Sequence, residues 1–350
     1  MHRANDQNTK SRDSRSSLGL NAAVLQLVTA AVWMGDNAAF LNLTPGACLD
    51  ELPYANNPSY ENFYIALELI IAVLAFIGNF LVCLAIIRTK KLRTVTNYFL
   101  VSLAVADMLV GLVAIPCAVL ADLGRPHHDM PLCLLMLSVL IVLTQSSVLS
   151  LLAVAAERYM AILLPFQYQR LMSPRAARLA LLLTWSLAVL SGCVPVIDWQ
   201  TPPGNSMYCI FTCVVHMSFM VYCNFFCFLL VPLIAMFIIY ARIFLIVRGQ
   251  LRRMAQARTC PSALEHKTPG EMHKATSLFL LLFLFTVCWM PIHLINCVLF
   301  FCPTCNVPMS ITLVAILLSH ANSALNPLLY AYRMRSFRQA LIEMFRCKHN

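Results

Sequence analysis

Seven segments of this chain are long and apolar enough to cross a lipid bilayer. A helix needs about 20 residues to cross a hydrocarbon core of about 30 Å. Segments of that kind lie at residues 63–88, 97–121, 131–157, 177–197, 215–246, 274–300 and 309–332. The sequence therefore predicts an all-α protein, a bundle of seven transmembrane helices that spans residues 61–333.

Composition supports a membrane protein and argues against a nucleic-acid partner. Charged residues make up 11% of the chain, against roughly a quarter in soluble domains. The net charge of +10 comes from short basic clusters between the apolar segments, where membrane lipids with anionic headgroups are the expected partners. These clusters occupy the first, third and fifth connections. Because positively charged loops stay in the cytoplasm, we expect an extracellular N-terminus and a cytoplasmic C-terminus.

The N-terminal region, residues 1–60, is expected to be an extracellular tail. A moderately apolar stretch at 18–34 follows three basic residues, which is typical of a cleaved signal peptide. A disordered tail with this composition by chance is an equal alternative. Asn42 begins an Asn-Leu-Thr sequon, so we expect a glycosylation site on this side of the membrane.

Two cytoplasmic segments are expected outside the bundle. Residues 249–272 contain Gly249, Pro261, Pro269 and Gly270 and predict a loop. Residues 334–350 combine basic residues with apolar ones at helical spacing, which predicts a short amphipathic helix on the inner leaflet. Cys347 at its end is a candidate for palmitoylation, with a free thiol as the alternative.

Polar residues inside the predicted spans need partners, because charge at membrane depth is costly. Asp107 lies in the middle of the second span, with Asn79 in the first and Asn322, Ser323 and Asn326 in the last. A carboxylate with neutral oxygens around it suits a hydrated Na⁺ ion. The alternative is a hydrogen-bonded cluster without an ion, and burial arguments alone favour that alternative.

Two further features suggest a bundle with two arrangements. Pro291 and Pro327 lie inside the sixth and seventh spans, where proline removes a backbone hydrogen bond and kinks the helix. At the cytoplasmic side, Arg158 ends the third span and Glu271 begins the sixth. These two charges could pair between the helices, or each could extend separately to water.

The cysteines divide into buried thiols and candidate disulfides. Cys133 and Cys209 both fall on the oxidising outer side, so a disulfide is expected between them. Cys302 and Cys305 could close a second, tight bridge. A zinc site there would need further ligands, and no neighbouring His or Cys supplies them. The pairing of Cys48 and Cys213 stays open.

Five motifs, in this order along the spans, resemble those of the rhodopsin-like G protein-coupled receptors. They are Asn79, residues 103–107, Glu157-Arg158-Tyr159, Trp289-Met290-Pro291 and Asn326-Pro327-Leu328-Leu329-Tyr330. Glu157 stands where most of that family has Asp. The resemblance covers about residues 60–347 and implies a plasma-membrane receptor that signals to a heterotrimeric G protein. It implies a switch at Asp107, Asn79, Trp289, Asn322, Asn326 and Tyr330, and G protein coupling through Glu157, Arg158, Tyr159 and Glu271.

Residues 96–104, 143–147, 293–297 and 318–323 resemble the adenosine receptors within that family. That resemblance implies that the Asn296 amide holds the adenine ring of adenosine and that Phe211 stacks on the purine. Thr144, Ser319 and His320 would bind the ribose, with Glu68 as the partner of His320. The rest of the pocket would be His293, Ile292, Ile316, Met220, Asn224, Ile141 and Leu140.

The chemistry of these residues agrees with a nucleoside ligand. An amide offers both a donor and an acceptor to adenine, and stacking on an aromatic ring contributes about 1–3 kcal/mol per base in nucleic-acid systems. Two residues depart from the adenosine receptors. Thr212 stands where several of them have Glu, and Leu140 is larger than the common Val, which predicts a shifted affinity or subtype preference.

Other function classes have less support in the sequence. A biogenic-amine receptor would have Asp in place of Leu140, and a retinal protein would have Lys in the last span, where there is none. A transporter would show internal repeats. The chain has no spaced catalytic carboxylates, metal-ligand set or phosphate loop, so we expect no enzymatic activity and no cofactor other than a possible allosteric Na⁺.

Overall fold

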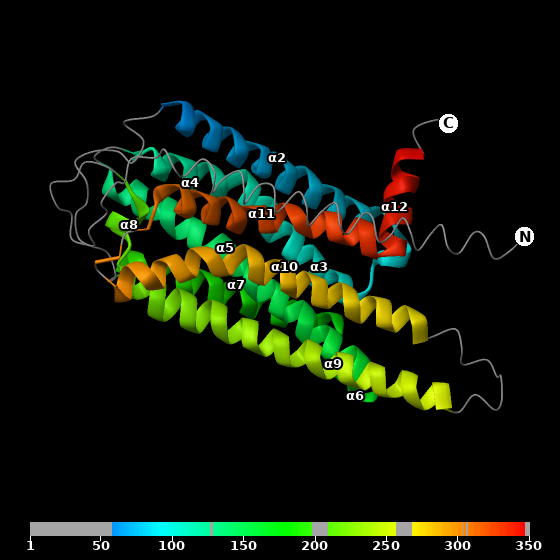
Figure 1. Ribbon diagram of the computed structural model, residues 1–350. Helices are drawn as coiled ribbons and strands as arrows, with labels where there is room; N and C mark the ends of the chain where they lie inside the picture. The colour runs from blue at the N-terminus through cyan, green and yellow to red at the C-terminus, as the bar shows by residue number, and fades with distance from the viewer. Residues whose placement is uncertain are drawn as a thin grey trace, which may run out of the picture.

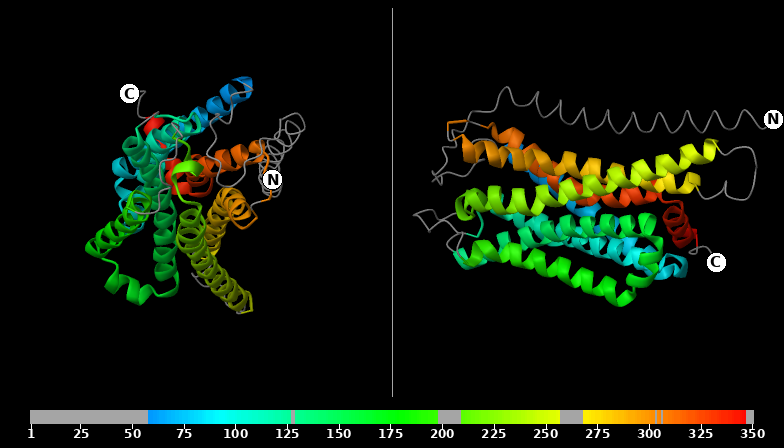
Figure 2. Two further views of the ribbon diagram at one scale, coloured as in Figure 1. Left: turned by 90° about the vertical axis from the view of Figure 1, so that its left-hand side faces the viewer. Right: turned by 90° about the horizontal axis from the view of Figure 1, so that it is seen from below.

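The computed structural model describes residues 58–126, 129–197, 209–256, 268–302, 304–305 and 307–346. Within these ranges the chain is helical and contains no strand, and seven helices are long and apolar enough to span a membrane. The helices lie along one another in a single bundle whose connections gather at its two ends (Figures 1 and 2). The predicted all-α, seven-helix fold is confirmed.

The spans follow the chain order. The first is α2 (Pro58–Arg88), and the second consists of α3 (Val95–Leu109), the π-helix η3 (Val110–Ala114) and α4 (Ile115–Asp122). The third and fourth are α5 (Met130–Leu163) and α7 (Pro174–Ile197). The fifth joins the π-helix η4 (Phe219–Leu230) to α9 (Val231–Gln256), and the last two are α10 (Thr268–Phe301) and α11 (Met309–Arg333). Shorter helices are η2 (Lys90–Leu92), α6 (Pro165–Leu171), α8 (Phe211–Val214) and α12 (Arg335–Arg346).

The two π-helices each end just before a proline. Pro116 is the second residue of α4, and Pro232 is the second residue of α9. Proline has no backbone N–H, and its ring clashes with the carbonyl four residues earlier. A widened turn before the proline relieves that clash while the helix continues across the membrane.

Several helix ends differ from the sequence prediction. The loop predicted at 249–272 is too long, because α9 runs on to Gln256 and α10 already begins at Thr268. Pro269 fits there, since a proline in the first helical turn leaves no hydrogen bond unmade. The third span extends to Leu163, six residues beyond the predicted end at 157. It stops where Leu164 precedes Pro165, because the residue before proline avoids the helical conformation.

The helices bury small and apolar residues toward one another and expose apolar side chains outward. Ala75 and Ala85 of α2 are fully buried, whereas Val73, Leu74 and Ile77 of the same helix are about half exposed. In water such an apolar outer surface would be unstable. In a bilayer it faces lipid, which agrees with a multi-pass membrane protein.

Helix α12 crosses the end of the bundle at an angle to the spans (Figure 1). Phe337 and Ala340 are buried against the inner core, and the Phe337 ring lies 6.2 Å from the ring of Tyr330 in α11. Arg338 and Gln339 are exposed. This division into an apolar and a polar face is expected of a helix that lies along a membrane surface.

Candidate functional site

A cavity of about 220 Å³ opens between the second, third, fifth, sixth and seventh spans. It lies toward the end of the bundle that carries α8, opposite α12 (Figure 1). Twelve of the residues predicted to bind ligand line it together: Leu140, Ile141, Thr144, Phe211, Met220, Asn224, Ile292, His293, Asn296, Ile316, Ser319 and His320.

Helical spacing explains why these residues meet. In α10, Ile292, His293 and Asn296 follow one another at intervals of one and three residues, and in α11 Ile316, Ser319 and His320 follow at intervals of three and one. Residues three or four positions apart share one face of a helix. Each helix therefore presents a narrow strip of mixed polar and apolar side chains to the cavity.

Phe211 reaches the cavity because a disulfide and a backbone hydrogen bond fix the segment before it. Cys209 forms a disulfide with Cys133 at the start of α5, and its backbone N–H donates to the Gly124 carbonyl at 3.1 Å. Gly124 has a φ of 68°, a left-handed conformation that ends α4 and suits glycine. These two connections bring the half-buried Phe211 side chain against the cavity.

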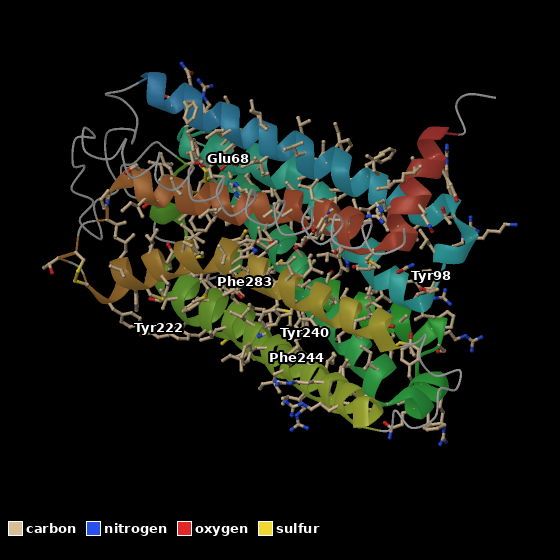
Figure 3. The ribbon with its side chains drawn as sticks, turned by 45° about the vertical axis from the view of Figure 1, so that its right-hand side comes forward. Glu68, Tyr98, Tyr222, Tyr240, Phe244 and Phe283 are labelled. Atoms are coloured by element: carbon tan, nitrogen blue, oxygen red, sulfur yellow. A yellow bond between two sulfur atoms is a disulfide. The ribbon has the colours of Figure 1, made fainter. Side chains whose placement is uncertain are left out.

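Glu68 does not line the cavity but contacts a residue that does. Its fully buried carboxylate lies 2.8 and 3.0 Å from Nδ1 of His320, and Figure 3 shows it on the side of α2 that faces α11. Glu68 and His320 therefore form a buried pair beside the cavity. The contact orients the His320 ring, whose edge borders the cavity.

Hydrogen bonds also orient the smaller polar groups. The hydroxyl of Thr144 donates to the carbonyls of Leu140 and Ile141 at 2.9 and 3.0 Å, and that of Ser319 donates to Ile316 at 2.7 Å. Since each hydroxyl proton is already engaged, the oxygens face the cavity as acceptors. A ligand hydroxyl could donate to them.

Sequence reasoning missed two polar contributors to this site. The buried Gln145 side chain donates through Nε2 to the Asn224 amide oxygen and so holds Asn224 at the cavity wall. Asp122, the last residue of α4, lines the cavity directly. Its position one residue beyond the predicted end of the second span made it look like a loop residue. Its charge beside an apolar span was the available signal.

Trp289, predicted as part of a switch, belongs to a group of neighbouring aromatic rings beside the cavity. Its ring lies 6.0 Å from His293 and 6.2 Å from Phe285, and His293 in turn stacks on Phe225 at 5.4 Å. Trp289 lines the cavity too. A ligand that contacts Asn296 or His293 therefore touches the face of α10 that also carries Trp289, close to Pro291.

The predicted polar cluster around Asp107 assembles in the centre of the bundle. Asp107 is fully buried, and Ser147 and Ser323 donate to its Oδ1 at 2.7 and 2.9 Å, while Asn326 donates to Oδ2 at 2.7 Å. Asn79 donates instead to the carbonyls of Ala75 and Ser323 at 2.8 and 2.9 Å. The buried oxygen Oδ1 of Asn79 has no protein partner among the described residues. Asn322 is buried nearby in α11.

The third span carries an ion pair near its last residues, at the end of the bundle away from the cavity. Glu157 accepts from Nε of Arg158 at 2.6 Å and from the hydroxyl of Tyr168 in α6 at 2.7 Å. Tyr159 packs against the inner core, where the buried Tyr330 also lies. Glu271 belongs to α10, but its side chain lies outside the described part of the structure. Its pairing with Arg158 stays a prediction.

The structure also joins Cys302 to Cys305 in a disulfide in the connection between α10 and α11. The remaining predicted features, glycosylation at Asn42, lipidation at Cys347 and the pairing of Cys48 with Cys213, involve side chains outside the described residues. Among the residues that are described, no group of three or more His, Cys, Asp or Glu side chains could hold a metal ion.

Comparison with known proteins places the chain in a family. Residues 78–330 match the family described as 7 transmembrane receptor (rhodopsin family). Adenosine receptor A2a of Homo sapiens is 43% identical over 303 residues, which cover 82% of this chain and 73% of that receptor. Adenosine receptor A2b of Rattus norvegicus is 44% identical over 297 residues, 79% of this chain and 88% of that receptor. The chain belongs to the rhodopsin family of seven-transmembrane receptors, in the adenosine receptor subfamily, and is not an enzyme.

Proposed function

We propose that this chain is a plasma-membrane receptor for extracellular adenosine, with its N-terminus outside the cell. Asn296 carries the proposal, because its amide lies in the cavity wall, 8% exposed, beside the other predicted contacts. An amide with both a donor and an acceptor recognises the amine and a ring nitrogen of adenine. Phe211 supplies a ring for stacking from another side of the cavity.

The ribose is assigned to the opposite part of the cavity. Ser319 and Thr144 present acceptor oxygens to its hydroxyls, and His320, held by Glu68, offers its ring edge. Apolar side chains of Ile141, Met220 and Ile316 complete the wall. The small number of polar groups in a largely apolar cavity is typical of a site that orients one small molecule.

The signal is assigned to a heterotrimeric G protein on the cytoplasmic side. Adenosine would bind one of two bundle arrangements more tightly, and a shift from 1:99 to 99:1 needs about 5.5 kcal/mol of differential affinity. The ligand contacts α10 and α11, and each contains a proline at which the helix can bend. Bending would separate the inner ends of α5 and α10, where Arg158 and Glu271 lie, and open a surface for the G protein. The G protein would in turn change adenylate cyclase activity.

The donor set around Asp107 fits a sodium ion. A carboxylate, the hydroxyls of Ser147 and Ser323 and the unpartnered oxygen of Asn79 are hard oxygen ligands at one buried place. A bound ion would neutralise the carboxylate in a medium of low dielectric constant. We assign the site to Na⁺, and the sodium dependence of adenosine affinity is the measurement that tests it.

A cyclic AMP assay tests the ligand assignment. In cells expressing the wild type, adenosine should change cyclic AMP, and the direction of change identifies the coupled G protein. Asn296→Ala should raise the adenosine concentration needed at least 100-fold, because the adenine ring loses about 3 kcal/mol of paired hydrogen bonding.

The matched control is Asn350→Ala, a change of the same kind at the last residue of the chain. It should leave the adenosine response unchanged, at equal surface expression. An adenosine response in Asn296→Ala that equals the wild type would overturn this binding mode. No response to adenosine in the wild type, with a response to an unrelated agonist, would overturn the ligand.

A further inference from the structure

Asp122 places a carboxyl group on the wall of the ligand cavity without an ion-pair partner of its own among the described residues. It is the only acidic residue among the described residues that line the cavity, and no Lys or Arg lies among them. The described ion pairs join Arg158 to Glu157 and His320 to Glu68, and Asp122 takes part in neither. Within the described part of the chain, the hydroxyl of Tyr64 donates a hydrogen bond to Oδ2 of Asp122 at 2.9 Å.

The nearest charges do not supply such a partner. Glu68 repels the Asp122 carboxylate and His320 attracts it, but the His320 ring is already paired with Glu68 at 2.8 Å. Even when His320 is protonated, two carboxylates share one positive charge. Arg125 lies three residues further along the chain and is exposed.

The surroundings of Asp122 make the lack of an ion-pair partner costly. Tyr64, its partner in α2, is buried, and Ala118 and Ala121 of α4 border the same part of the cavity. A carboxylate with few hydrogen bonds beside apolar side chains is poorly solvated. A cationic group brought in by a ligand would gain a strong interaction there, because electrostatic attraction grows as the dielectric constant falls.

We propose that Asp122 forms a subsite for a protonated amine on the ligand, next to the nucleoside site. This inference rests on the proposed function, because the nucleoside places the amine. The preferred ligands would be adenosine derivatives with a primary ammonium group on a short chain directed toward the end of α4. Tyr64 positions the carboxylate by holding Oδ2, and Oδ1 faces the ammonium group.

Paired ligands test the proposal. Adenosine derivatives with a short aminoalkyl chain at purine C2, at purine N6 or at the ribose 5′ position are each compared with their N-acetylated, neutral forms. Competition against a tritiated adenosine analogue gives the affinity ratio of the two forms in membranes from cells expressing each variant. Because the ratio is taken within one variant, it does not depend on how much receptor folds.

In the wild type, the ammonium form should bind at least tenfold more tightly than the acetylated form at one attachment position or more. Asp122→Asn keeps the shape and the bond from Tyr64 but removes the charge, and should bring the ratio below threefold. Asp122→Ser should do the same. Asp129→Asn is the matched control, because Asp129 is an exposed carboxylate that caps α5 outside the cavity, and it should keep the wild-type ratio.

The outcomes separate the two proposals. A ratio near one at all three positions in the wild type would overturn the subsite, as would equal ratios in the wild type and both Asp122 variants. Loss of the preference in Asp129→Asn would assign it to general surface charge. In each of those cases adenosine still competes and the proposed function stands. If adenosine does not compete in the wild type, both proposals fall.

Discussion

At the scale of single residues, the contacts of buried polar groups explain most of the site. Glu68 is fully buried, yet its carboxylate has the His320 ring within hydrogen-bonding distance through both oxygens. Asp107 likewise accepts hydrogen bonds from three side chains on two other helices. Buried charges are tolerated when partners of this kind surround them. Each of these buried carboxylates therefore connects neighbouring helices in addition to its place in the cavity surroundings or the central cluster.

Removing one partner of the Glu68–His320 pair should destabilise the receptor. A buried ion pair that loses one member costs roughly 3–5 kcal/mol in soluble proteins, because the other charge stays buried. Glu68→Gln and His320→Asn should each lower the temperature of unfolding of the ligand-free receptor in detergent. The double variant should lower the temperature of unfolding by clearly less than the sum of the two single-variant decreases.

The control for this comparison of single and double variants is Glu343→Gln, because Glu343 is exposed on α12. It should leave the unfolding temperature unchanged. Strictly additive losses in the double variant would mean that the two side chains act independently.

At the scale of helices, close approach depends on small residues. Gly111 of η3 packs on α2 so tightly that a Cβ atom there would lie 2.6 Å from the Ala72 carbonyl oxygen. Glycine allows backbones to approach in this way, as in many transmembrane helix pairs. The π-turn that contains Gly111 then leads into Pro116 and α4. The position of Asp122 at the end of α4 depends on this packing.

Gly111→Ala should lower thermal stability, by about 1–3 kcal/mol as for other overpacked sites. It should also weaken ligand binding, because α4 must shift to make room. Gly249→Ala is the matched control, since a Cβ at Gly249 meets nothing within 4 Å and the residue lies inside α9. There alanine should be neutral or stabilise the helix by up to about 1 kcal/mol. Thermal unfolding of the two purified variants measures both effects, and equal behaviour of the two would contradict the packing argument.

At the scale of the whole molecule, one bundle contains a ligand cavity toward one end, a polar cluster at its centre and an ion pair toward the other end. The spans that carry them are shared: α10 and α11 border the cavity, and α11 supplies Ser323 and Asn326 to the central cluster. A movement of α11 must therefore change the surroundings of both the ligand and Asp107. By linkage, two ligands that prefer different arrangements weaken each other's binding by the same factor.

Sodium should for that reason lower the affinity for adenosine. The proposed cation at Asp107 would stabilise the arrangement described here, in which Asp107 and α11 are in contact. Raising NaCl, with choline chloride replacing it at constant ionic strength, should weaken adenosine binding several-fold. Asp107→Asn should remove that dependence. A sodium effect that persists in the variant would place the ion elsewhere.

Several features of this protein could be read from its sequence because their causes are local. The seven spans follow from the length of apolar segments, since the bilayer imposes that length on each helix separately. The cavity strips of α10 and α11 follow from helical spacing together with the resemblance to adenosine receptors. Helix α12 follows in the same way from apolar residues at helical spacing among basic ones.

Other features depend on contacts between distant parts of the chain, and only the tertiary structure decided them. The Cys133–Cys209 bridge and the Cys209–Gly124 hydrogen bond bring Phe211 to the cavity. The π-turn of η3 and the close approach at Gly111 set the direction of α4, and so bring Asp122 to the cavity wall. The bond from Tyr168 to Glu157 joins α6 to α5. A sequence pattern indicates which face of a helix is polar, but the groups that this face meets depend on how all the helices pack together.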